Sequence, residues 1–500
     1  MSEDVLRLTA RDQLGMLASG EVSAVELLDE HLDRIDEVNG VVNAIVSMDR
    51  GIARAAAAAS DRRRADGEPL GALEGLPTAF KDLEEAAGFR TTWGSVRFAE
   101  HVSSTDGDVV ARMRAAGVVP LGKTNTPEFG TGSHTQNAVF GVTRNPYDPS
   151  RSAGGSSGGA AAALAAGMLP IADGSDMGGS LRNPASFCNV VGFRPTPGVV
   201  PNTPGRDLWN TLPVKGPMAR TVRDAALLLS VIAGESSASP ISFPGGGARF
   251  AAVSAEEPDQ GMLRGLRVAW SPTVGGIDVD PRVVAVLQER AVAELTAAGA
   301  IVVERTLERE LEGVDEAFRT LRAHGYAASF REAVASSREL LAPELVANTE
   351  WGLDLTAADL ARADELRVRA FGRFARLFED VDVIAAPAAT VPPFPVEERW
   401  VREVAGVPQA DYLEWMRAAW RFTPLGGASM SVPCGFTDDG LPIGLQLVVA
   451  PRRDEFLLRV AAAFEERVPA WREPPGILGA PGDGARSADV MPPGLRAWRA

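Results

Sequence analysis

The chain has 500 residues, of which 45% are hydrophobic and 23% are charged. This composition is that of an ordinary globular protein and excludes a disordered or fibrous chain. The formal net charge of −16 argues against a surface that follows phosphate groups, so we expect no nucleic-acid partner. The two cysteines, Cys188 and Cys434, are too few for a disulfide framework or for a zinc site of four thiolates.

Two segments bear on where the protein resides. The N-terminal sequence MSEDVLRLTA has no basic stretch followed by an apolar one, so it does not resemble a secretory signal. The uncharged run over 152–172 consists mainly of Gly, Ser and Ala and lacks the Leu, Ile and Val density of a membrane-spanning helix. We therefore expect a cytoplasmic protein that does not enter a membrane.

The first sixty residues are predicted to be helical. Ser23 and Glu26 have the spacing of a capping box, and apolar residues then recur at helical spacing up to a stop at Gly40. From about residue 76, short apolar runs alternate with Ala-rich helical stretches such as 108–116 and 160–166. Strands that alternate with helices favour an α/β architecture.

The second half of the chain continues this alternation. A polar loop over 234–261 precedes a strand–helix–strand unit over 265–305, residues 310–420 are mostly helical, and further strands are expected at 381–389 and 442–450. From residue 471 on, the chain is Pro, Gly, Ala and Arg without periodicity. We expect one domain over 1–470 and a loosely attached tail over 471–500.

Side chains that can move a proton near neutral pH are few. Of the fifty basic residues, the lysines are Lys81, Lys123 and Lys215 alone, and the others are arginines. Arginine stays protonated in proteins, whereas a lysine taken out of water can become a proton acceptor. The four histidines are scattered singly, without a metal-binding spacing, so we expect no metal and no cofactor.

Residues 117–124, GVVPLGKT, match the phosphate-binding pattern G-x-x-x-x-G-K-T. In that motif the four intervening residues form a flexible anion cradle that opens a helix. Here they are Val, Val, Pro and Leu, which predict a buried strand. Nucleotide binding is therefore the weaker interpretation.

Residues 154–158, GGSSG, match the nucleophile elbow G-x-S-x-G. That motif needs a strand before it and a histidine late in the chain to complete a triad. The preceding residues are turn-like and the last histidine is His324, so this interpretation is also disfavoured. The glycines fit instead a loop whose backbone amides approach an anion or a second backbone.

Three segments taken together give the strongest signal. The first, 75–82, places Lys81 at the end of an apolar strand; the second, 154–159, surrounds Ser156; the third, 174–182, carries Ser180. Taken singly, the lysine segment could be a solvated strand end, and a Gly/Ser segment could be a linker. A linker does not usually adjoin a strongly apolar helix and strand, however, and three such segments in this order are hard to assign to chance.

These segments resemble the amidase signature family, the serine hydrolases with a Ser–cis-Ser–Lys triad. The resemblance extends from about residue 10 to about residue 465 through segments such as GKTNTPEFG, GPMARTVRDAALLL and SVPCGFTDDGLPIGLQLV. It implies one large α/β domain with a mixed twisted β-sheet covered by α-helices, a signature core at about 70–235 and a more variable substrate-pocket segment at about 310–420. It also implies that Ser180 is the nucleophile, Ser156 the serine after a cis peptide bond, and Lys81 the base.

The chemistry gives each of these residues a reason. A serine hydroxyl needs a base within about 2.6–3.2 Å, and Lys81 can serve only if burial lowers its pKa from about 10.4 towards 7–8. Asp82 must then face the other way, as alternate side chains of a strand do. Backbone N–H groups that can converge on an oxyanion are those of Met177, Gly178, Gly179 and Ser180. The residues expected to support this loop are Asp176, Arg182 and Ser157.

The substrate is expected to be a small-molecule amide with an apolar or aryl group. Aromatic residues occur in or next to the variable segment, although core packing explains them equally well: Trp351, Tyr412, Trp415, Trp420 and Phe422. Thr423 and Ala428 depart from the family's usual Asn-x-x-Gly-x-Pro pattern, and Ser175 stands where Thr is common, which leaves the substrate class open. We take Tyr412, Trp415 and Thr423 as pocket candidates.

The expected activity is hydrolysis of carbon–nitrogen bonds of linear amides through an acyl-enzyme on Ser180. Two alternatives within the fold stay open: the glutamine-hydrolysing subunit of a tRNA-dependent amidotransferase, and a carbamate or ester hydrolase. Rivals from other classes are a nucleotide-binding regulator that uses 117–124 and a catalytically silent relative. A homodimer is possible.

Overall fold

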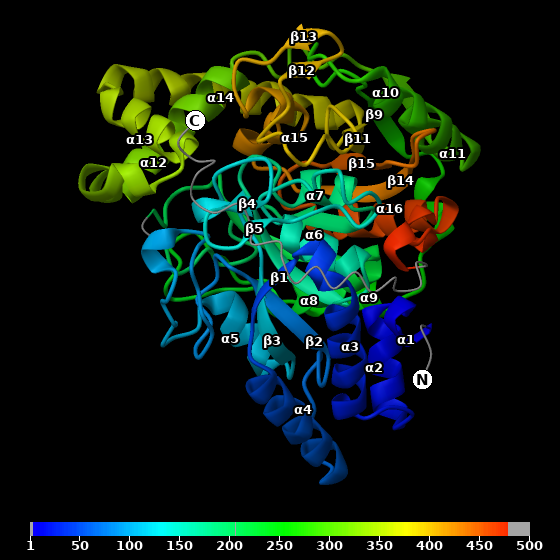
Figure 1. The fold of residues 1–500 in the computed structure, drawn as a ribbon. Coiled ribbons are helices and arrows are strands. Elements are labelled where there is room, and N and C mark those ends of the chain that lie inside the picture. Colours follow the sequence, from blue (N-terminus) through cyan, green and yellow to red (C-terminus); the bar gives the residue numbers. More distant parts are fainter. Residues whose placement is uncertain (1–3, 206, 479–500) are drawn as a thin grey trace.

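A computed structural model describes residues 4–205 and 207–478 of the chain (Figure 1). Its centre is an eight-stranded mixed sheet in the order β10-β9-β11-β15-β14-β7-β8-β6. The neighbours β10, β9 and β11 are parallel, and the other neighbours are antiparallel. The strands are β6 (Ile171–Asp176), β7 (Val191–Arg194), β8 (Val214–Ala219), β9 (Arg267–Trp270), β10 (Ile301–Glu304), β11 (Val383–Pro387), β14 (Ser429–Phe436) and β15 (Pro442–Val448).

A second sheet carries Lys81 and was not separated from the first in the sequence analysis. It has the order β1-β3-β2, with β1 (Ile45–Met48), β3 (Val119–Thr124) and β2 (Pro77–Lys81). Side chains join β2 to the edge strand β6: Thr78 Oγ1 donates to the Ile171 carbonyl at 3.2 Å, and the Lys81 N–H donates to the Asp173 carboxylate at 3.0 Å. The seam between the sheets therefore brings the lysine beside the strand that leads to Ser180.

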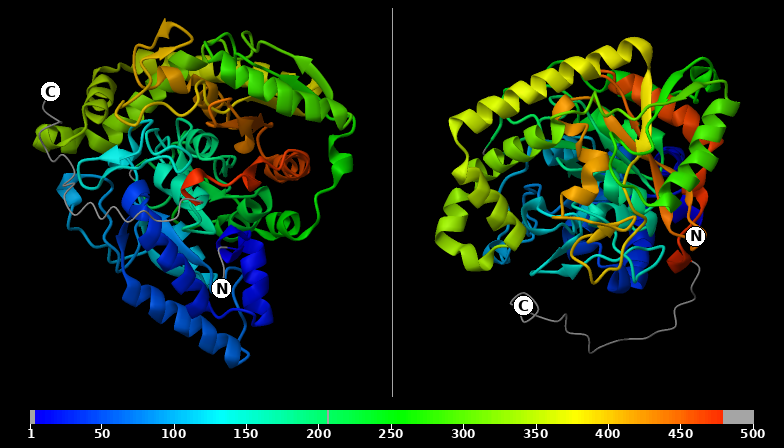
Figure 2. Two further views of the ribbon diagram at one scale, coloured as in Figure 1. Left: turned by 45° about the vertical axis from the view of Figure 1, so that its right-hand side comes forward. Right: turned by 90° about the horizontal axis from the view of Figure 1, so that it is seen from above.

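Helices cover both sheets. The N-terminal helices α2–α4 lie at the opposite end of the molecule from α12–α14 (Figures 1 and 2). The helices are α1 (Asp4–Arg7), α2 (Ala10–Ser19), α3 (Ala24–Val42), α4 (Arg50–Ala65), α5 (Asp108–Ala115), α6 (Gly158–Ala165), α7 (Arg182–Phe187), α8 (Val222–Ile232), α9 (Ala248–Ala255), α10 (Pro281–Leu287), α11 (Ala293–Ala297), α12 (Val314–Ser337), α13 (Pro343–Asp354), α14 (Ala357–Asp380), α15 (Arg417–Trp420) and α16 (Asp454–Arg467). The Ser23–Glu26 capping box is confirmed, but α3 runs two residues past Gly40 and ends where Asn43 takes a left-handed conformation.

The Gly/Ser segment before α6 is a close-packed junction, not a linker. Every residue of α6 is buried. A Cβ atom at Gly158 would lie 2.3 Å from Thr135 Oγ1, and one at Gly159 would lie 2.3 Å from the backbone nitrogen of Asn125. A larger residue cannot fit at either position, so the composition of this segment follows from close approach of the backbone.

The expected helical segment over 310–420 is confirmed in α12–α14, which pack together at one side of the molecule (Figure 2). In residues 4–205 and 207–478, no helix has both the length and the apolar character that crossing a membrane requires. At the start of the expected tail, the Tyr147 hydroxyl donates to the Glu473 carbonyl at 2.7 Å. Residues 479–500 lie outside the described residues.

Candidate active site

Lys81 ends strand β2, and its side chain is sealed from solvent with 0% exposure. Its Nζ lies 2.8 Å from Ser156 Oγ, 2.8 Å from Ser157 Oγ and 3.0 Å from Ser175 Oγ. Hydroxyl groups can both donate and accept hydrogen bonds, so this shell suits an amine without a charge. Within residues 4–205 and 207–478, no carboxylate forms an ion pair with Lys81.

Burial lowers the pKa of Lys81 from 10.5 to about 7, although the charges of Asp173, Glu84 and Asp176 act in the opposite direction. Much of the amine is therefore neutral at ordinary pH and can accept a proton. The pKa lies in the range that the sequence analysis required of a lysine base.

Ser156 links the lysine to the cavity. The peptide bond between Gly155 and Ser156 is cis, as the family resemblance implies. The Ser156 hydroxyl contacts Lys81, and the residue lines the same cavity as the half-buried Ser180. Of the two contacts that a proton relay needs, the structure contains the one from Lys81 to Ser156. The contact from Ser156 to Ser180 stays a prediction.

Asp176 fixes the loop between β6 and α7 that carries Ser180. Its carboxylate accepts the N–H groups of Gly179 at 3.0 Å and Leu181 at 3.1 Å, and it pairs with Arg182 at 2.9 Å. Although burial opposes it, the guanidinium groups of Arg182 and Arg194 hold the pKa of Asp176 well below its usual range. Asp176 and Arg182 therefore lie where the predicted support of this loop requires them.

One expected oxyanion donor is already engaged. The N–H group of Gly179 points to the Asp176 carboxylate, so it is not available to an oxyanion. Gly179 has a φ of 108°, a left-handed conformation that favours glycine. The N–H groups of Met177, Gly178 and Ser180 remain the predicted donors.

Two further residues support the same loop. The Ser157 N–H group donates to the Ser180 carbonyl at 3.2 Å. Thr423 was expected to line the cavity, but it is buried outside the lining, and its hydroxyl donates to the Met177 carbonyl at 2.9 Å. Thr423 therefore positions the loop and does not contact the substrate space.

Asp173 and Ser175 are neighbours of the lysine that were not expected from the sequence. Both lie on β6, two residues apart, so their side chains share the face that meets β2. Asp173 is fully buried and its Oδ2 has no hydrogen-bond partner among the described residues. Burial raises the pKa of Asp173 to about 6. No local pattern in the sequence marks this pair, because its role depends on how β6 meets β2.

Asp173→Asn is expected to move the acid limb of the kcat/KM profile to lower pH by about one unit. The asparagine oxygen can still accept the Lys81 N–H, but the negative charge that raises the pKa of Lys81 is gone. A pH profile of amine release measures the shift. A limb that stays in place, or moves to higher pH, would contradict the proposed effect of the Asp173 charge on the pKa of Lys81.

Asp82 faces away from the site. Its carboxylate accepts the Thr92 N–H at 3.0 Å and the Thr92 hydroxyl at 2.5 Å, which confirms the expected alternation along β2.

The two disfavoured motifs also lack their structural context. Residues 119–124 form the buried strand β3, with Lys123 sealed inside, and no strand occurs between 143 and 157, before the elbow-like glycines.

Ser156 and Ser180 line a cavity of about 970 Å³. Five aromatic rings line it in a chain of contacts, with successive centroid distances of 5.0, 6.2, 5.1 and 5.4 Å: Trp93, Phe98, Phe129, Phe330 and Tyr326. We call this set the aromatic wall. No sequence pattern marks it, because its members come from three segments far apart in the chain.

Most of the aromatic residues expected in the pocket lie elsewhere. Trp415 stacks on Phe187 at 5.9 Å and Trp420 on Phe318 at 4.5 Å, and both tryptophans are fully buried. Phe422 is also buried in the core, and Trp351 is 40% exposed, away from the cavity. Of the five expected rings, Tyr412 lines the cavity. Trp415 and Trp420 instead pack in a hydrophobic cluster with Phe187, Phe318 and Phe394, as large rings do in cores.

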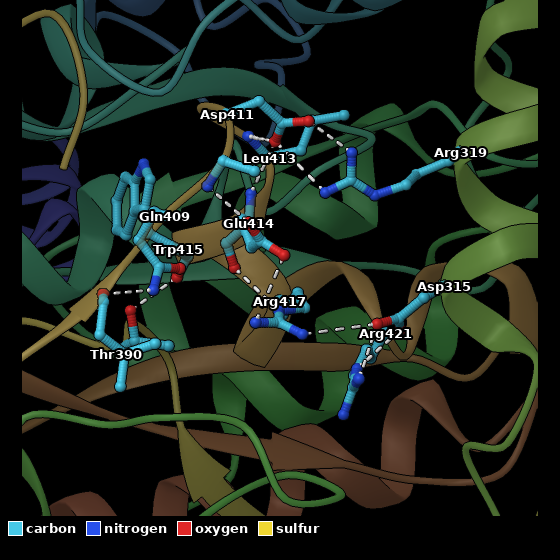
Figure 3. A network of polar contacts seen from close by, with 12 residues as sticks. Asp315, Arg319, Thr390, Gln409, Asp411, Leu413, Glu414, Trp415, Arg417 and Arg421 are labelled. Carbon is cyan, nitrogen blue, oxygen red and sulfur yellow. Dashed lines mark hydrogen bonds and ion pairs between the residues drawn. The ribbon is translucent and has the colours of Figure 1, made fainter. Parts of the chain in front are cut away.

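Ion pairs hold the segment 409–421, which carries Tyr412 (Figure 3). Asp411 pairs with Arg319 of α12, and their Oδ1 and Nη2 atoms are 3.2 Å apart. Asp315, at the start of the same helix, pairs with Arg421 at 2.6 Å. These contacts fix Tyr412 against α12.

Known proteins are similar in sequence to this chain over nearly its full length. A family model described as Amidase matches residues 26–458. The acylamidase of Rhodococcus erythropolis is 36% identical over 92% of this chain and 95% of its own length. One subunit of the glutamyl-tRNA(Gln) amidotransferase of Salinispora arenicola is 36% identical over 94% of this chain and 99% of its own length.

Solved structures share the fold. A bacterial aryl acylamidase of the amidase signature family matches with a TM-score of 0.87 at 28% identity, over 95% of this chain and 99% of that one. A 6-aminohexanoate cyclic dimer hydrolase, solved with its substrate, matches with a TM-score of 0.82 at 29% identity, over 95% and 99%. The family match and these relatives define a hydrolase acting on carbon–nitrogen bonds of linear amides. The chain belongs to the amidase signature family, and the expected fold class is confirmed.

Proposed function

We propose that this amidase hydrolyses small amides with an apolar or aryl group through an acyl-enzyme on Ser180. The observation that carries the proposal is the Lys81 amine, sealed from solvent and surrounded by three serine hydroxyls. With a pKa of about 7, this amine can act as a general base at ordinary pH.

In the first half-reaction Lys81 takes the proton of Ser156, Ser156 takes the proton of Ser180, and Ser180 Oγ attacks the amide carbon. The carbonyl electron pair moves to oxygen, where backbone N–H groups of the loop stabilise the oxyanion. Collapse of this intermediate breaks the C–N bond, and the proton returns through Ser156 to the leaving nitrogen. Water then attacks the acyl-enzyme by the same relay, which releases the carboxylic acid and restores Ser180.

The aromatic wall supports the substrate class. Its five rings border the cavity onto which Ser156 and Ser180 open, and such a surface favours an aryl or apolar group over a charged one. The similarity to an acylamidase and to an aryl acylamidase agrees with this preference.

A panel of anilides, aliphatic amides, carbamates and esters, read for amine or alcohol release, tests the proposal. We expect the anilides to give the highest kcat/KM, and a sulfonyl fluoride to label Ser180 in the wild type but not in Ser180→Ala. Turnover without label at Ser180 would contradict the acyl-enzyme. A higher kcat/KM for carbamates or esters would assign the site to that alternative.

A second candidate is a glutamine-hydrolysing subunit, because the Salinispora arenicola amidotransferase chain is 36% identical over almost all of both sequences. Such a subunit would release ammonia from glutamine for a partner chain that handles tRNA. Glutamine hydrolysis that exceeds anilide hydrolysis, or that appears only with partner proteins and tRNA, would favour this candidate.

A further inference from the structure

Arg322 on α12 is a buried cation in the wall of the active-site cavity, with 4% exposure. Its guanidinium group donates to the Tyr326 hydroxyl at 2.8 Å, to the Tyr412 hydroxyl and to the Asn348 side-chain oxygen. All three partners are neutral. Within residues 4–205 and 207–478, no ion pair joins Arg322 to a carboxylate, and a buried charge without a counter-ion is costly.

The acidic side chain closest in sequence to these partners is committed elsewhere. Asp411 precedes Tyr412, but its carboxylate pairs with Arg319 and accepts the Leu413 N–H at 2.9 Å (Figure 3). Arg319 lies one turn before Arg322 on the same helix and does not line the cavity. Of these two neighbouring arginines, the one that faces the cavity is therefore the one without an acidic partner.

Tyr412 adds a hydrogen-bond donor beside this cation. Its oxygen accepts from Arg322 and, at 3.2 Å, from Asn348 Nδ2, while no acceptor for its own proton occurs among the described residues. Burial raises the pKa of Tyr412, so the phenol keeps that proton. The guanidinium group and the phenol thus present positive charge and a donor at one point of the cavity wall.

We propose that Arg322 and Tyr412 bind a carboxylate of the substrate, so that the preferred amides carry a carboxylate away from the bond that is cleaved. This rests on the proposed function and narrows it. Arg322 supplies the buried positive charge for one carboxylate. The cavity lining also holds Arg97 and the acidic groups Glu85 and Asp207, and these acidic groups would disfavour a more highly charged anion. The Tyr326 ring, 4.1 Å from the guanidinium carbon, continues into the aromatic wall and would contact an aryl group of the same substrate.

Matched chromogenic substrates test this specificity. Glutaryl 4-nitroanilide and its methyl ester place a carboxylate or a neutral group on the acyl side, and 5-acetamido-2-nitrobenzoate and 4-nitroacetanilide do so on the amine side. We expect one carboxylate form to exceed its neutral match in kcat/KM by about tenfold to a hundredfold, the effect of a hydrogen bond to a charged group. Arg322→Gln should remove this preference, mainly through KM of the carboxylate form.

Three variants separate recognition from packing. Arg322→Lys keeps the charge and should retain part of the preference, whereas Arg319→Gln, the matched control, should retain all of it. Tyr412→Phe should weaken it. Tyr412 also borders a smaller cavity of about 20 Å³, which has room for a water molecule. If Tyr412→Phe keeps the full preference for the carboxylate, the phenol proton points into that smaller cavity and Tyr412 does not bind the carboxylate. Equal losses on both members of each pair in Arg322→Gln would assign Arg322 a structural role and overturn the proposal.

A binding measurement keeps the proposal independent of turnover. Calorimetry with Ser180→Ala should show tighter binding of 5-acetamido-2-nitrobenzoate or of glutaryl 4-nitroanilide than of its neutral match, and the difference should vanish in the double variant with Arg322→Gln. Preference in binding without hydrolysis of any anilide would contradict the proposed function and leave carboxylate recognition standing. Hydrolysis of the neutral anilides with no preference in either measurement would contradict carboxylate recognition alone.

Discussion

Lys81→Met is expected to lower kcat/KM for a neutral anilide by about 10²–10⁴-fold, the usual contribution of a positioned general base. The variant loses the one amine that contacts Ser156, Ser157 and Ser175 and keeps a side chain of similar length. Amine release under saturating and limiting substrate measures the loss, which should fall on kcat.

Two controls accompany this variant. Lys123→Met removes another fully buried lysine, which contacts Thr91 and not the catalytic serines, so activity per folded molecule should fall less than about tenfold. Lys81→Met should be at least as stable as the wild type at pH 7, because each unit of a lowered lysine pKa costs about 1.4 kcal/mol. That cost is fully present below pH 7 and fades as the pH rises to 10.5. A Lys81→Met enzyme that keeps a tenth or more of wild-type activity would contradict the role of Lys81.

Asp176→Asn is expected to lower the free energy of unfolding by about 3–5 kcal/mol, the effect of breaking a buried ion pair. Asp176 is sealed between Arg182 and Arg194, with exposure near 0% for all three side chains. The variant leaves two buried guanidinium groups without a counter-ion. Urea denaturation at pH 7 measures the loss of stability. The substitution should also loosen the loop that carries Ser180.

An exposed ion pair provides the matched control for Asp176→Asn. Glu316 and Arg362 join α12 to α14 with side chains 47% and 61% exposed. Glu316→Gln should change the free energy of unfolding by less than about 1 kcal/mol, as is usual for a surface pair. Equal effects of the two substitutions would show that burial of Asp176 does not set its contribution.

The sequence predicts those parts of the site in which residue type and local spacing are constrained together. Lys81 at a strand end and Ser156 in a close-packed glycine segment are brought together as expected, and Asp82 faces away because strand side chains alternate. Asp173 and Ser175 escaped notice because their role depends on the pairing of two sheets across a seam. That seam is a tertiary contact, which no local pattern reports.

The substrate cavity is the part that the sequence predicts least. Trp415 and Trp420 are of a residue type common in pockets, but they lie in the core. The aromatic wall instead contains residues from segments far apart in the chain, such as Trp93 and Phe330. Large aromatic side chains serve both purposes, so their presence alone cannot distinguish a pocket from a core. The hydrogen bond from the Gly179 amide to Asp176 likewise depends on a loop conformation that the sequence does not specify.

The central claim is that Lys81 is uncharged at ordinary pH, and lysine labelled with ¹³C at Cε tests it directly. The chain has three lysines, Lys81, Lys123 and Lys215, so the NMR spectrum is sparse and Lys81→Met assigns the signal. We expect this signal to titrate with a midpoint near pH 7, the same pH at which kcat/KM should rise. A Lys81 signal that stays at the protonated shift up to pH 9 or above would contradict it.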